Sequence, residues 1–266
     1  KVGHVLLTAY MTSAFVLASI AAFRMLKGSK HIYYKKSLYL FMKLGLVFSI
    51  GTAIVGDFSA KYLVEYQPEK LAAAEWHFET EKGASLLVFG LRDGEDVKYA
   101  IRIPYALSLL AHNDPFAEVT GLNEFPEDET PPLYIHFLFD LMVMIGFFMV
   151  GVSAIYVIGK LRRWRFIHSR WFRWVVVAGG PLSMIAIEAG WWLAEVGRQP
   201  WILVHYMKVA EAATSSDHVD LMLLIFCVVY LILGIGSVVV LRRMFKRNPI
   251  EKEIADRHAE KGGGIS

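Results

Sequence analysis

The sequence predicts an all-α polytopic membrane protein with five transmembrane helices and a long, partly helical outer loop. Three segments of 19 to 21 residues carry no charged side chain: Val5–Phe23, Leu141–Gly159 and Leu221–Leu241. About 20 apolar residues span a bilayer core as a helix. In addition, 55% of the 266 residues are hydrophobic, which is rare in a soluble domain of this length.

Two further segments complete the five spans, and each contains one ionisable residue. Ser37–Gly56 contains Lys43, and Trp174–Ala194 contains Glu188. With flanking residues included, the expected order is a helix over 1–26, a helix over 37–56, an outer loop over 57–133, a helix over 134–160, a helix over 172–195, a second outer loop over 196–218, a helix over 219–242 and a tail over 243–266. The first span begins at the first residue, without an initiator Met or a signal peptide, so we expect a fragment of a longer protein.

The charges predict the orientation of these helices. Arg24–Lys36 has five basic and no acidic residues, and Lys160–Arg173 has six basic and no acidic residues. More basic residues follow the last span, on the same side if the five helices alternate. Because basic residues near helix ends mark the cytoplasmic face, we expect the C-terminus in the cytoplasm and the loop over 57–133 outside. That loop has fifteen acidic and six basic residues.

The long loop is expected to contain structure of its own. Pro68–Glu79 reads as a helix, with its proline in the first turn and an acid close behind. A weakly alternating stretch over 98–103 is followed by a predicted short helix over 104–111. The single cysteine, Cys227, excludes an intrachain disulfide and a thiolate-bound metal cluster.

Ionisable and sulfur-containing side chains within the spans are the candidates for chemistry. Counted from the basic ends at 1.5 Å per residue, His4, Met142, Trp191 and Glu195 lie roughly 27–33 Å from the inner face. All four therefore belong to the outer part of the membrane, and His with Met is an established axial pair for low-spin haem. Depth alone does not select them, because an interfacial His is most often solvated and Met usually fills gaps.

The most specific signal is Gly190-Trp-Trp-Leu-Ala-Glu-Val-Gly-Arg-Gln-Pro-Trp201, with three tryptophans in 12 residues. An interfacial aromatic belt accounts for the tryptophans, but not for the Glu, the Arg and the Gln-Pro beside them. This stretch resembles the GWxxxExGRQPW signature of subunit I of the cytochrome bd-type quinol oxidases. The resemblance extends along the chain, from Lys1-Val-Gly-His4 through Gln67-Pro-Glu-Lys-Leu-Ala-Ala-Ala-Glu75 to Leu141-Met-Val143.

The resemblance implies roles for individual residues. His4 and Met142 would be the axial ligands of the low-spin haem b, and Glu195 would serve the high-spin haem b. Trp191 would stand between haems, and Arg198 would meet a haem propionate. Asp140 departs from the pattern, since a member of the family has arginine there and an acid would not neutralise propionates.

Lys70 and Glu75 fall on the residues that the family uses to oxidise ubiquinol or menaquinol, with Glu75 taking a proton and Lys70 binding a quinone oxygen. On a regular helix they point about 140° apart and do not form a facial pair. The loop is short, as in the short-loop branch of the family.

The implied function is that of subunit I of a terminal respiratory oxidase in a bacterial or archaeal cytoplasmic membrane. Electrons would pass from quinol through two haems b to haem d, where oxygen is reduced to water. The implied partners are subunit II, a small single-helix subunit and membrane lipid, with no nucleic acid. Since the family's further ligands lie in its first four helices, this fragment alone is expected to be inactive.

Two alternatives stay open on the sequence. One is a related quinol oxidase that lacks haem d. The other is a membrane transporter with charged groups at broken helices near the midplane. The candidate residues gather at the outer face, and no span is expected to be broken, which disfavours the transporter.

Overall fold

The computed structural model describes residues 2–93, 96–247, 249, 252 and 254–255. The chain divides into two compact units, Lys1–Ala212 and Ala213–Ser266, which are described separately below. Within the described part of the chain, five helices are long and apolar enough to cross a membrane, which confirms the predicted fold class. Four of them belong to the first unit: α1 (Val2–Leu26), α2 (Ile32–Tyr66), α5 (Ile135–Leu161) and α6 (Arg170–Val196).

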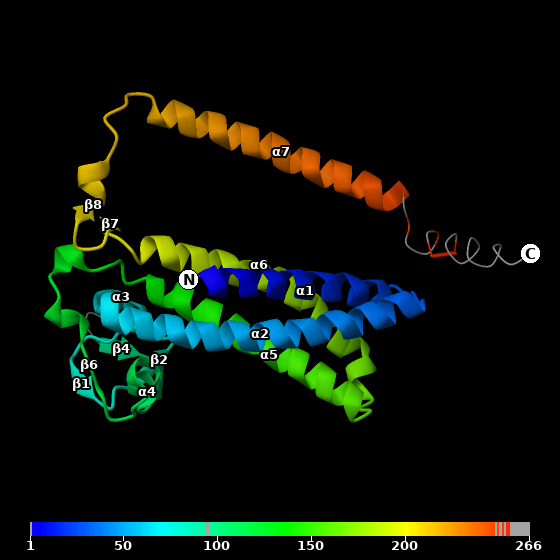
Figure 1. The fold of residues 1–266 in the computed structure, drawn as a ribbon, viewed down its shortest axis with the longest axis horizontal. Helices are drawn as coiled ribbons and strands as arrows, with labels where there is room; N and C mark the ends of the chain where they lie inside the picture. The colour runs from blue at the N-terminus through cyan, green and yellow to red at the C-terminus, as the bar shows by residue number, and fades with distance from the viewer. Residues whose placement is uncertain (1, 94–95, 248, 250–251, 253, 256–266) are drawn as a thin grey trace, which may run out of the picture. The chain divides into compact units, whose positions relative to one another are not determined.

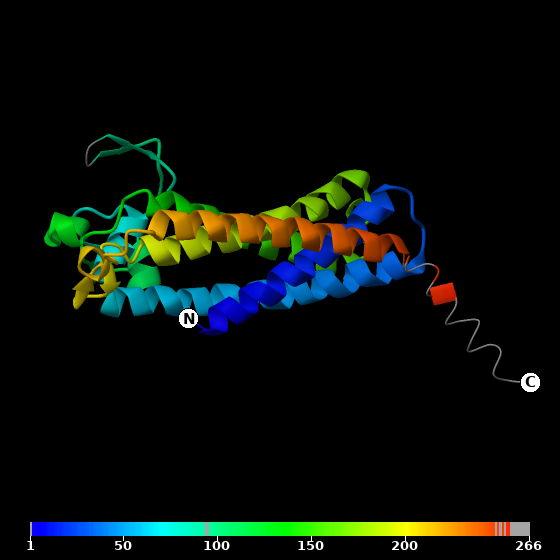
Figure 2. The ribbon, with the colours of Figure 1, turned by 90° about the horizontal axis from the view of Figure 1, so that it is seen from above.

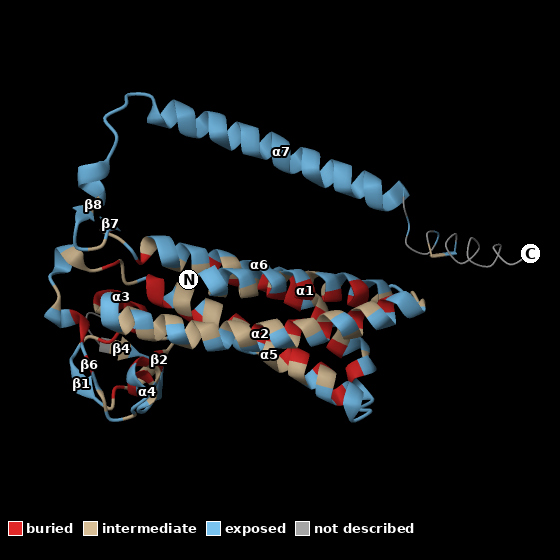
Figure 3. Cartoon of the chain, viewed as in Figure 1, coloured by how far each residue is buried: buried red, intermediate tan, exposed pale blue. Residues whose placement is uncertain are grey.

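These four helices lie side by side, and α1 runs along α2 (Figures 1 and 2). Buried positions alternate with exposed ones along these helices, as Figure 3 shows. Many of the exposed residues are large and hydrophobic, as expected for helix faces in contact with lipid. The helices approach closely at glycines. Phe15 of α1 is fully buried against Gly45 of α2 and Gly179 of α6, where an added Cβ would lie 3.0 Å and 2.9 Å from its ring. Small residues permit this close packing of membrane helices.

A proline in α6 explains one polar contact between helices. Pro181 has no backbone N–H, so the Val177 carbonyl four residues earlier loses its donor within the helix. The Ser19 hydroxyl of α1 donates to that carbonyl at 2.8 Å. A carbonyl freed inside a membrane must find such a donor, and α6 continues unbroken through the proline.

Helix α2 is longer than the segment predicted for it over 37–56. It begins after His31, whose ring nitrogen Nδ1 accepts a hydrogen bond of 3.2 Å from the Tyr33 backbone N–H. It ends at Tyr66, because Pro68 disfavours helical backbone at Gln67. Between these signals nothing breaks the helix, so its 35 residues extend about 52 Å, well beyond a hydrocarbon core of about 30 Å.

The first ten residues of the loop predicted over 57–133 belong to α2, and the chain from Gln67 onward folds into short elements at one end of the helices (Figure 1). Helix α3 (Pro68–Glu75) starts at its proline, as predicted, and ends at Trp76, which adopts a left-handed conformation with φ 49°. The remaining elements are three antiparallel strand pairs, one short helix and two 3-10 turns: β1 (Glu81–Lys82) with β6 (Glu118–Val119), β2 (Leu86–Val88) with β5 (Ile101–Ile103), β3 (Leu91–Asp93) with β4 (Asp96–Lys98), α4 (Ala106–His112), Leu122–Glu124 and Glu127–Glu129.

The connections on either side of α6 are short. A 3-10 turn, Phe166–His168, joins α5 to α6, and the Ser169 hydroxyl caps α6 by accepting from the Phe172 N–H at 3.1 Å. After α6, strands β7 (Trp201–Leu203) and β8 (Met207–Lys208) pair, and a 3-10 turn follows over Val209–Ala212.

The second unit contains α7 (Val219–Arg247). None of its residues is buried, and its side chains are apolar on every face. A helix that is apolar all round belongs in a membrane or a protein interior. The predicted tail over 243–266 lies mostly outside the described residues, because residues 256–266 are not among them.

Candidate functional site

Helix α3 carries Lys70 and Glu75, the two residues expected to take part in quinol oxidation, and places them next to two different membrane helices. It contacts α5 directly, and its Lys70 side chain reaches the end of α6. All residues of α3 after its proline are buried, including three charged ones, Glu69, Lys70 and Glu75. Charged residues are almost never buried in a short surface helix without a role or a partner. The structure thus gives this eight-residue helix an unusual, wholly enclosed position.

Lys70 is directed at the C-terminal end of α6. Its ammonium group donates to the Ala194 carbonyl at 3.2 Å, and it packs where Gly197 leaves room. The last carbonyls of a helix have no donor within the helix and carry partial negative charge, so a cation is favourable there. Lys70 therefore lies beside the segment that holds Glu195 and Arg198.

Glu75 is enclosed on the opposite side of α3, facing α5. Its side chain is 1% exposed, and neither carboxyl oxygen has a hydrogen-bond partner among the described residues. Burial, reinforced by the nearby negative charge of Asp140, raises the pKa of the Glu75 carboxyl to about 8. A buried carboxyl with a pKa near neutral is suited to exchanging protons with a substrate.

Sequence reasoning missed a histidine beside Glu75. His136 of α5 is fully buried, and its Nδ1 lies 2.7 Å from the carbonyl oxygen of Ala74. Its Nε2 lies 3.4 Å from Asp140, and its ring stacks on Trp76 at a centroid distance of 4.2 Å. The spacing of His136 and Asp140, four residues apart on one helix face, was the available signal for this pair.

Asp140, where a member of the family has arginine, makes two contacts of its own in this structure. Its carboxylate accepts a hydrogen bond of 2.6 Å from the Phe89 backbone N–H, in addition to facing His136. The acid thus holds the turn between β2 and β3 against α5. An arginine at this position could not accept from that N–H.

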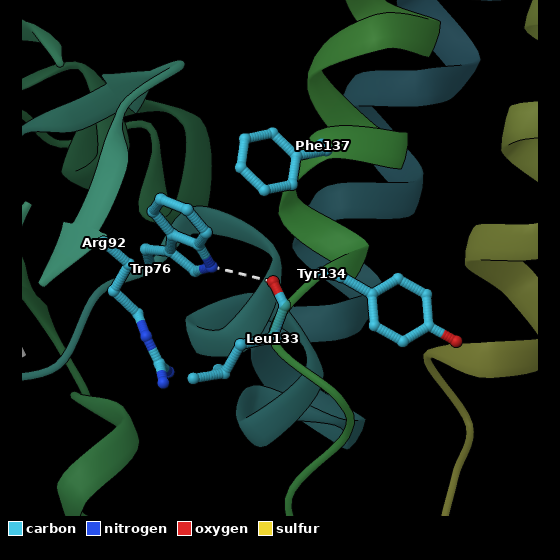
Figure 4. A pocket seen from close by; sticks show the side chains of 5 residues that line it. All are labelled: Trp76, Arg92, Leu133, Tyr134 and Phe137. Atoms are coloured by element: carbon cyan, nitrogen blue, oxygen red, sulfur yellow. Dashed lines mark hydrogen bonds between the residues drawn. The ribbon is translucent and has the colours of Figure 1, made fainter. Parts of the chain in front are cut away.

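A pocket of about 400 Å³ opens beside this cluster (Figure 4). Its walls are three aromatic rings, an aliphatic side chain and a guanidinium group: Trp76, Tyr134, Phe137, Leu133 and Arg92. The Trp76 indole N–H donates to the Leu133 carbonyl at 2.7 Å, which fixes one wall. Lys70 and Glu75 do not line the pocket, although Glu75 directly precedes Trp76.

The two predicted ligands of the low-spin haem pack against glycines of different helices. His4 of α1 lies against Gly56 of α2, where an added Cβ would be 3.6 Å from its Cε1. Met142 of α5 lies against Gly190 of α6, where an added Cβ would be 2.9 Å from its sulfur. Each of the two candidate ligands thus lies against a glycine, which has no side chain and leaves space beside the ligand.

These residues fit a low-spin haem by their chemistry. The His4 Nδ1 atom is buried without a hydrogen-bond partner among the described residues, so no other side chain there engages this imidazole nitrogen. Imidazole and thioether together form a known axial pair for haem iron. His4 and Met142 are the side chains that would hold such a group here.

The tryptophan-rich motif runs over the end of α6 and into β7. Trp191 is largely exposed in this chain. Glu195 and Arg198 form an ion pair of 3.6 Å, with side chains 50% and 44% exposed. Their openness leaves the Glu195 carboxylate accessible to a group bound outside this chain. By contrast Trp201 is buried, with the Lys208 ammonium 5.3 Å from its ring centroid.

Comparison with known proteins identifies the family. The sequence profile described as "Cytochrome bd terminal oxidase subunit I" matches residues 1–249. A Bacillus subtilis (strain 168) protein named "Putative cytochrome bd menaquinol oxidase subunit I" is 42% identical over 260 residues, covering 95% of this chain and 58% of that protein. The "Cytochrome bd ubiquinol oxidase subunit 1" of the same organism is 31% identical over 260 residues, covering 92% and 55%.

A solved structure agrees with the sequence comparisons. The bd oxidase from Geobacillus thermodenitrificans has a chain with 63% sequence identity and a TM-score of 0.86, covering 94% of this chain and 58% of that one. The chain therefore spans somewhat more than half the length of the relatives it matches. This chain belongs to the cytochrome bd terminal oxidase subunit I family.

Proposed function

We propose that this chain forms the quinol-oxidising part of subunit I of a quinol:oxygen oxidoreductase. The observation that carries the proposal is Glu75, fully buried on a loop helix, with both carboxyl oxygens unpaired among the described residues. Such a group lacks its own partner and is suited to a substrate hydroxyl. The quinol oxidase relatives support quinol as that substrate.

Quinol oxidation releases two protons and two electrons. Glu75, in its charged form, would accept one proton from a quinol hydroxyl, pass it through the acidic long loop to solvent, and then accept the second proton in the same way. The two electrons would leave one at a time for the haem groups. Lys70, beside Glu195, would donate a hydrogen bond to a quinone oxygen after turning from the Ala194 carbonyl. The pocket of about 400 Å³ that Trp76 lines, directly after Glu75 in the chain, has the largely apolar and aromatic walls that a quinone ring requires.

Haem groups held by His4 and Met142 and by Glu195 would supply the one-electron carriers for this reaction. Trp191 follows Gly190, against which Met142 packs, and precedes Glu195 by four residues on α6, so it would line the path between the two haem groups. Arg198 would meet a propionate. Haem d, subunit II and a small single-helix subunit belong to the proposal for the whole complex. Reduction of oxygen to water would take place with residues outside this chain.

The direct test replaces Glu75 with Gln in the complete oxidase. General-base catalysis typically contributes about 10²–10⁴-fold, so quinol oxidation should fall by that order while the haem absorption bands remain. Glu69→Gln is the matched control, because Glu69 is also buried on α3 and should leave the rate within a few-fold. Normal turnover in Glu75→Gln, or an equal loss in both variants, would remove Glu75 from the mechanism.

The haem content has its own test. A reduced-minus-oxidised spectrum of the complex should show b-type bands together with a red-shifted chlorin band from haem d. Bands of b type alone would assign the complex to the haem-d-lacking branch. A spectrum without any haem bands would favour the alternative that the protein is a membrane transporter.

The proposed orientation places the long loop outside and the basic connections in the cytoplasm. A cysteine at Glu127, in the acidic loop, should react with a membrane-impermeant maleimide in intact cells, after Cys227 has been replaced by Ala. A cysteine at Lys30, in the basic connection between α1 and α2, should react only after the cells are opened. The reverse pattern would invert the proposed topology.

A further inference from the structure

We propose that His136 is a positioning residue for quinol oxidation: it fixes the backbone on both sides of Glu75 and so holds the Glu75 carboxyl group in its buried place. This inference rests on the proposed function, because it assigns His136 a role through Glu75. The family resemblance assigned no role to His136. The role is inferred from the contacts that His136 of α5 makes with α3.

The first contact is made to the residue before Glu75. The His136 Nδ1 atom lies 2.7 Å from the Ala74 carbonyl oxygen, within a site where His136 is wholly buried. A carbonyl oxygen can only accept, so Nδ1 carries the proton and donates it. This hydrogen bond connects positions 62 residues apart in the sequence and ties the last turn of α3 to α5.

The second contact is made to the residue after Glu75. The Trp76 ring stacks on the His136 ring at 4.2 Å and 21°, and its N–H is held by the Leu133 carbonyl just before α5. Trp76 is left-handed at φ 49°, a conformation that is uncommon for non-glycine residues and that here caps the C-terminus of α3. The stack and the N–H bond hold the Trp76 side chain against His136 and Leu133.

These contacts matter because Glu75 has no polar anchor of its own. Neither of its carboxyl oxygens has a hydrogen-bond partner among the described residues, so the backbone around it determines where the carboxyl group lies. His136 makes both of the contacts described above: its Nδ1 atom hydrogen-bonds the Ala74 carbonyl before Glu75, and its ring stacks on Trp76 after it.

The same helix also carries the proposed haem ligand Met142. Six residues separate His136 from Met142, about 9 Å along the helix axis. A rigid connection from Glu75 through His136 to α5 therefore sets the distance between the proton acceptor and the proposed electron acceptor. Small displacements in such a geometry are sufficient to slow a reaction about 10²-fold.

The decisive experiment compares two amide substitutions in the complete oxidase. In His136→Asn the side-chain NH2 group falls near the Nδ1 position and can still donate to Ala74. In His136→Gln the amide falls near the Nε2 position, facing Asp140, and the bond to Ala74 is lost. Both variants lose the ring stack on Trp76, so the difference between them reports the hydrogen bond to Ala74. We expect His136→Gln to lower kcat for a short-chain quinol by roughly 10- to 100-fold with little change in KM, and His136→Asn to lower it by only a few-fold.

Combination with Glu75→Gln shows whether His136 acts through Glu75. The double variant His136→Gln/Glu75→Gln should oxidise quinol no more slowly than Glu75→Gln alone. A further, multiplicative loss would overturn the inference, as would equal rates for the Asn and Gln variants. If Glu75→Gln itself turns over normally, the proposed function fails as well. If Glu75→Gln is slow but His136→Gln is normal, only the inference about His136 fails.

Assembly is monitored by the low-spin haem spectrum of each variant. Should His136→Gln fail to assemble, Trp76→Leu tests the other contact, since it removes the stack and leaves the Ala74 hydrogen bond in place. Because Trp76 also lines the proposed quinone pocket, the supporting result is a lower kcat at unchanged KM and haem content that disappears in the Glu75→Gln background. An unchanged kcat in Trp76→Leu, or an equal loss in both backgrounds, would overturn the positioning role.

Discussion

The ammonium group of Lys70 donates a hydrogen bond of 3.2 Å to the carbonyl of Ala194, which joins the loop helix α3 to the end of the membrane helix α6. Five residues later on α3, Glu75 faces α5 instead. The two side chains thus reach different membrane helices, in keeping with the angle of about 140° between them on a regular helix. Lys70 thus ties α3 to α6, while the end of α3 that carries Glu75 packs against α5; these are two of the three helices that carry the proposed haem residues.

Replacing Lys70 with Met should lower both stability and activity. The change leaves the Ala194 carbonyl without this donor, at a cost of about 1–3 kcal/mol in the free energy of unfolding. Thermal unfolding of the detergent-solubilised complex measures this loss, and quinol oxidation should slow at the same time. Lys61→Met is the control, because Lys61 pairs with Asp57 in its own helix at a partly exposed position and should change neither quantity appreciably. Unchanged stability in Lys70→Met would mean that the hydrogen bond contributes nothing measurable.

The raised pKa of Glu75 predicts how stability depends on pH. The folded state holds the Glu75 proton up to about pH 8, whereas the unfolded chain releases it near 4.5. The folded state therefore binds more protons in this window, and the contribution of Glu75 to stability is present below pH 4.5 and is lost as the pH rises to about 8. The Tm of the wild-type complex should fall over this range more steeply than that of Glu75→Gln. Parallel Tm curves for the two proteins would contradict the raised pKa.

The contact of Ser19 with Val177 predicts a non-additive pair of mutations. Ser19→Ala removes the hydroxyl that satisfies the carbonyl freed by Pro181, and such bonds between membrane helices contribute about 0.6–2 kcal/mol. In a Pro181→Ala background the backbone N–H of residue 181 can donate to Val177, so Ser19→Ala should then cost less. The control Ser13→Ala removes a hydroxyl that bonds within its own helix, to Ala9. Equal costs in both backgrounds would rule out this explanation.

Met142 should control the low-spin haem spectrum. Met142→Leu removes the thioether and should shift or abolish the low-spin haem b band in the reduced complex. Met149→Leu is the matched control, because Met149 is a fully buried core residue on the same helix and a Leu of similar volume should leave the band unchanged. A normal band in Met142→Leu would exclude Met142 as a ligand.

Gly190 should position Met142. An alanine Cβ at Gly190 would lie 2.9 Å from the Met142 sulfur, so the thioether must move. If it is an axial ligand, the low-spin haem band or its midpoint potential should shift in Gly190→Ala. Gly151→Ala, at a position on α5 with nothing within 4 Å, should shift neither. A Gly190→Ala spectrum identical to that of the wild type would show that the contact between Gly190 and Met142 has no effect on haem ligation.

The spanning helices could be predicted because hydrophobic runs and basic flanks are local features of the chain. The ends of these helices were harder to predict. Helix α2 extends well beyond 37–56, because its boundaries depend on the cap at His31 and on Pro68 rather than on hydropathy. Within the long loop, the proline predicted where α3 begins. It ends at Trp76, whose backbone is left-handed and whose ring stacks on His136 of α5, a contact that local sequence does not predict.

The candidate site divides in the same way. The residue types and spacing of the tryptophan-rich motif, His4, Met142, Lys70 and Glu75 were readable from the chain and its resemblance to a family. What surrounds them was not, because His136 meets Ala74 across 62 residues and Lys70 meets Ala194 across 124. The sequence by itself determined five apolar helices, their charged flanks and a set of reactive side chains, since these depend on local composition. Only the tertiary structure decided which of those side chains became buried, paired or left without a partner, because burial and hydrogen bonding are made between segments that are distant in the sequence.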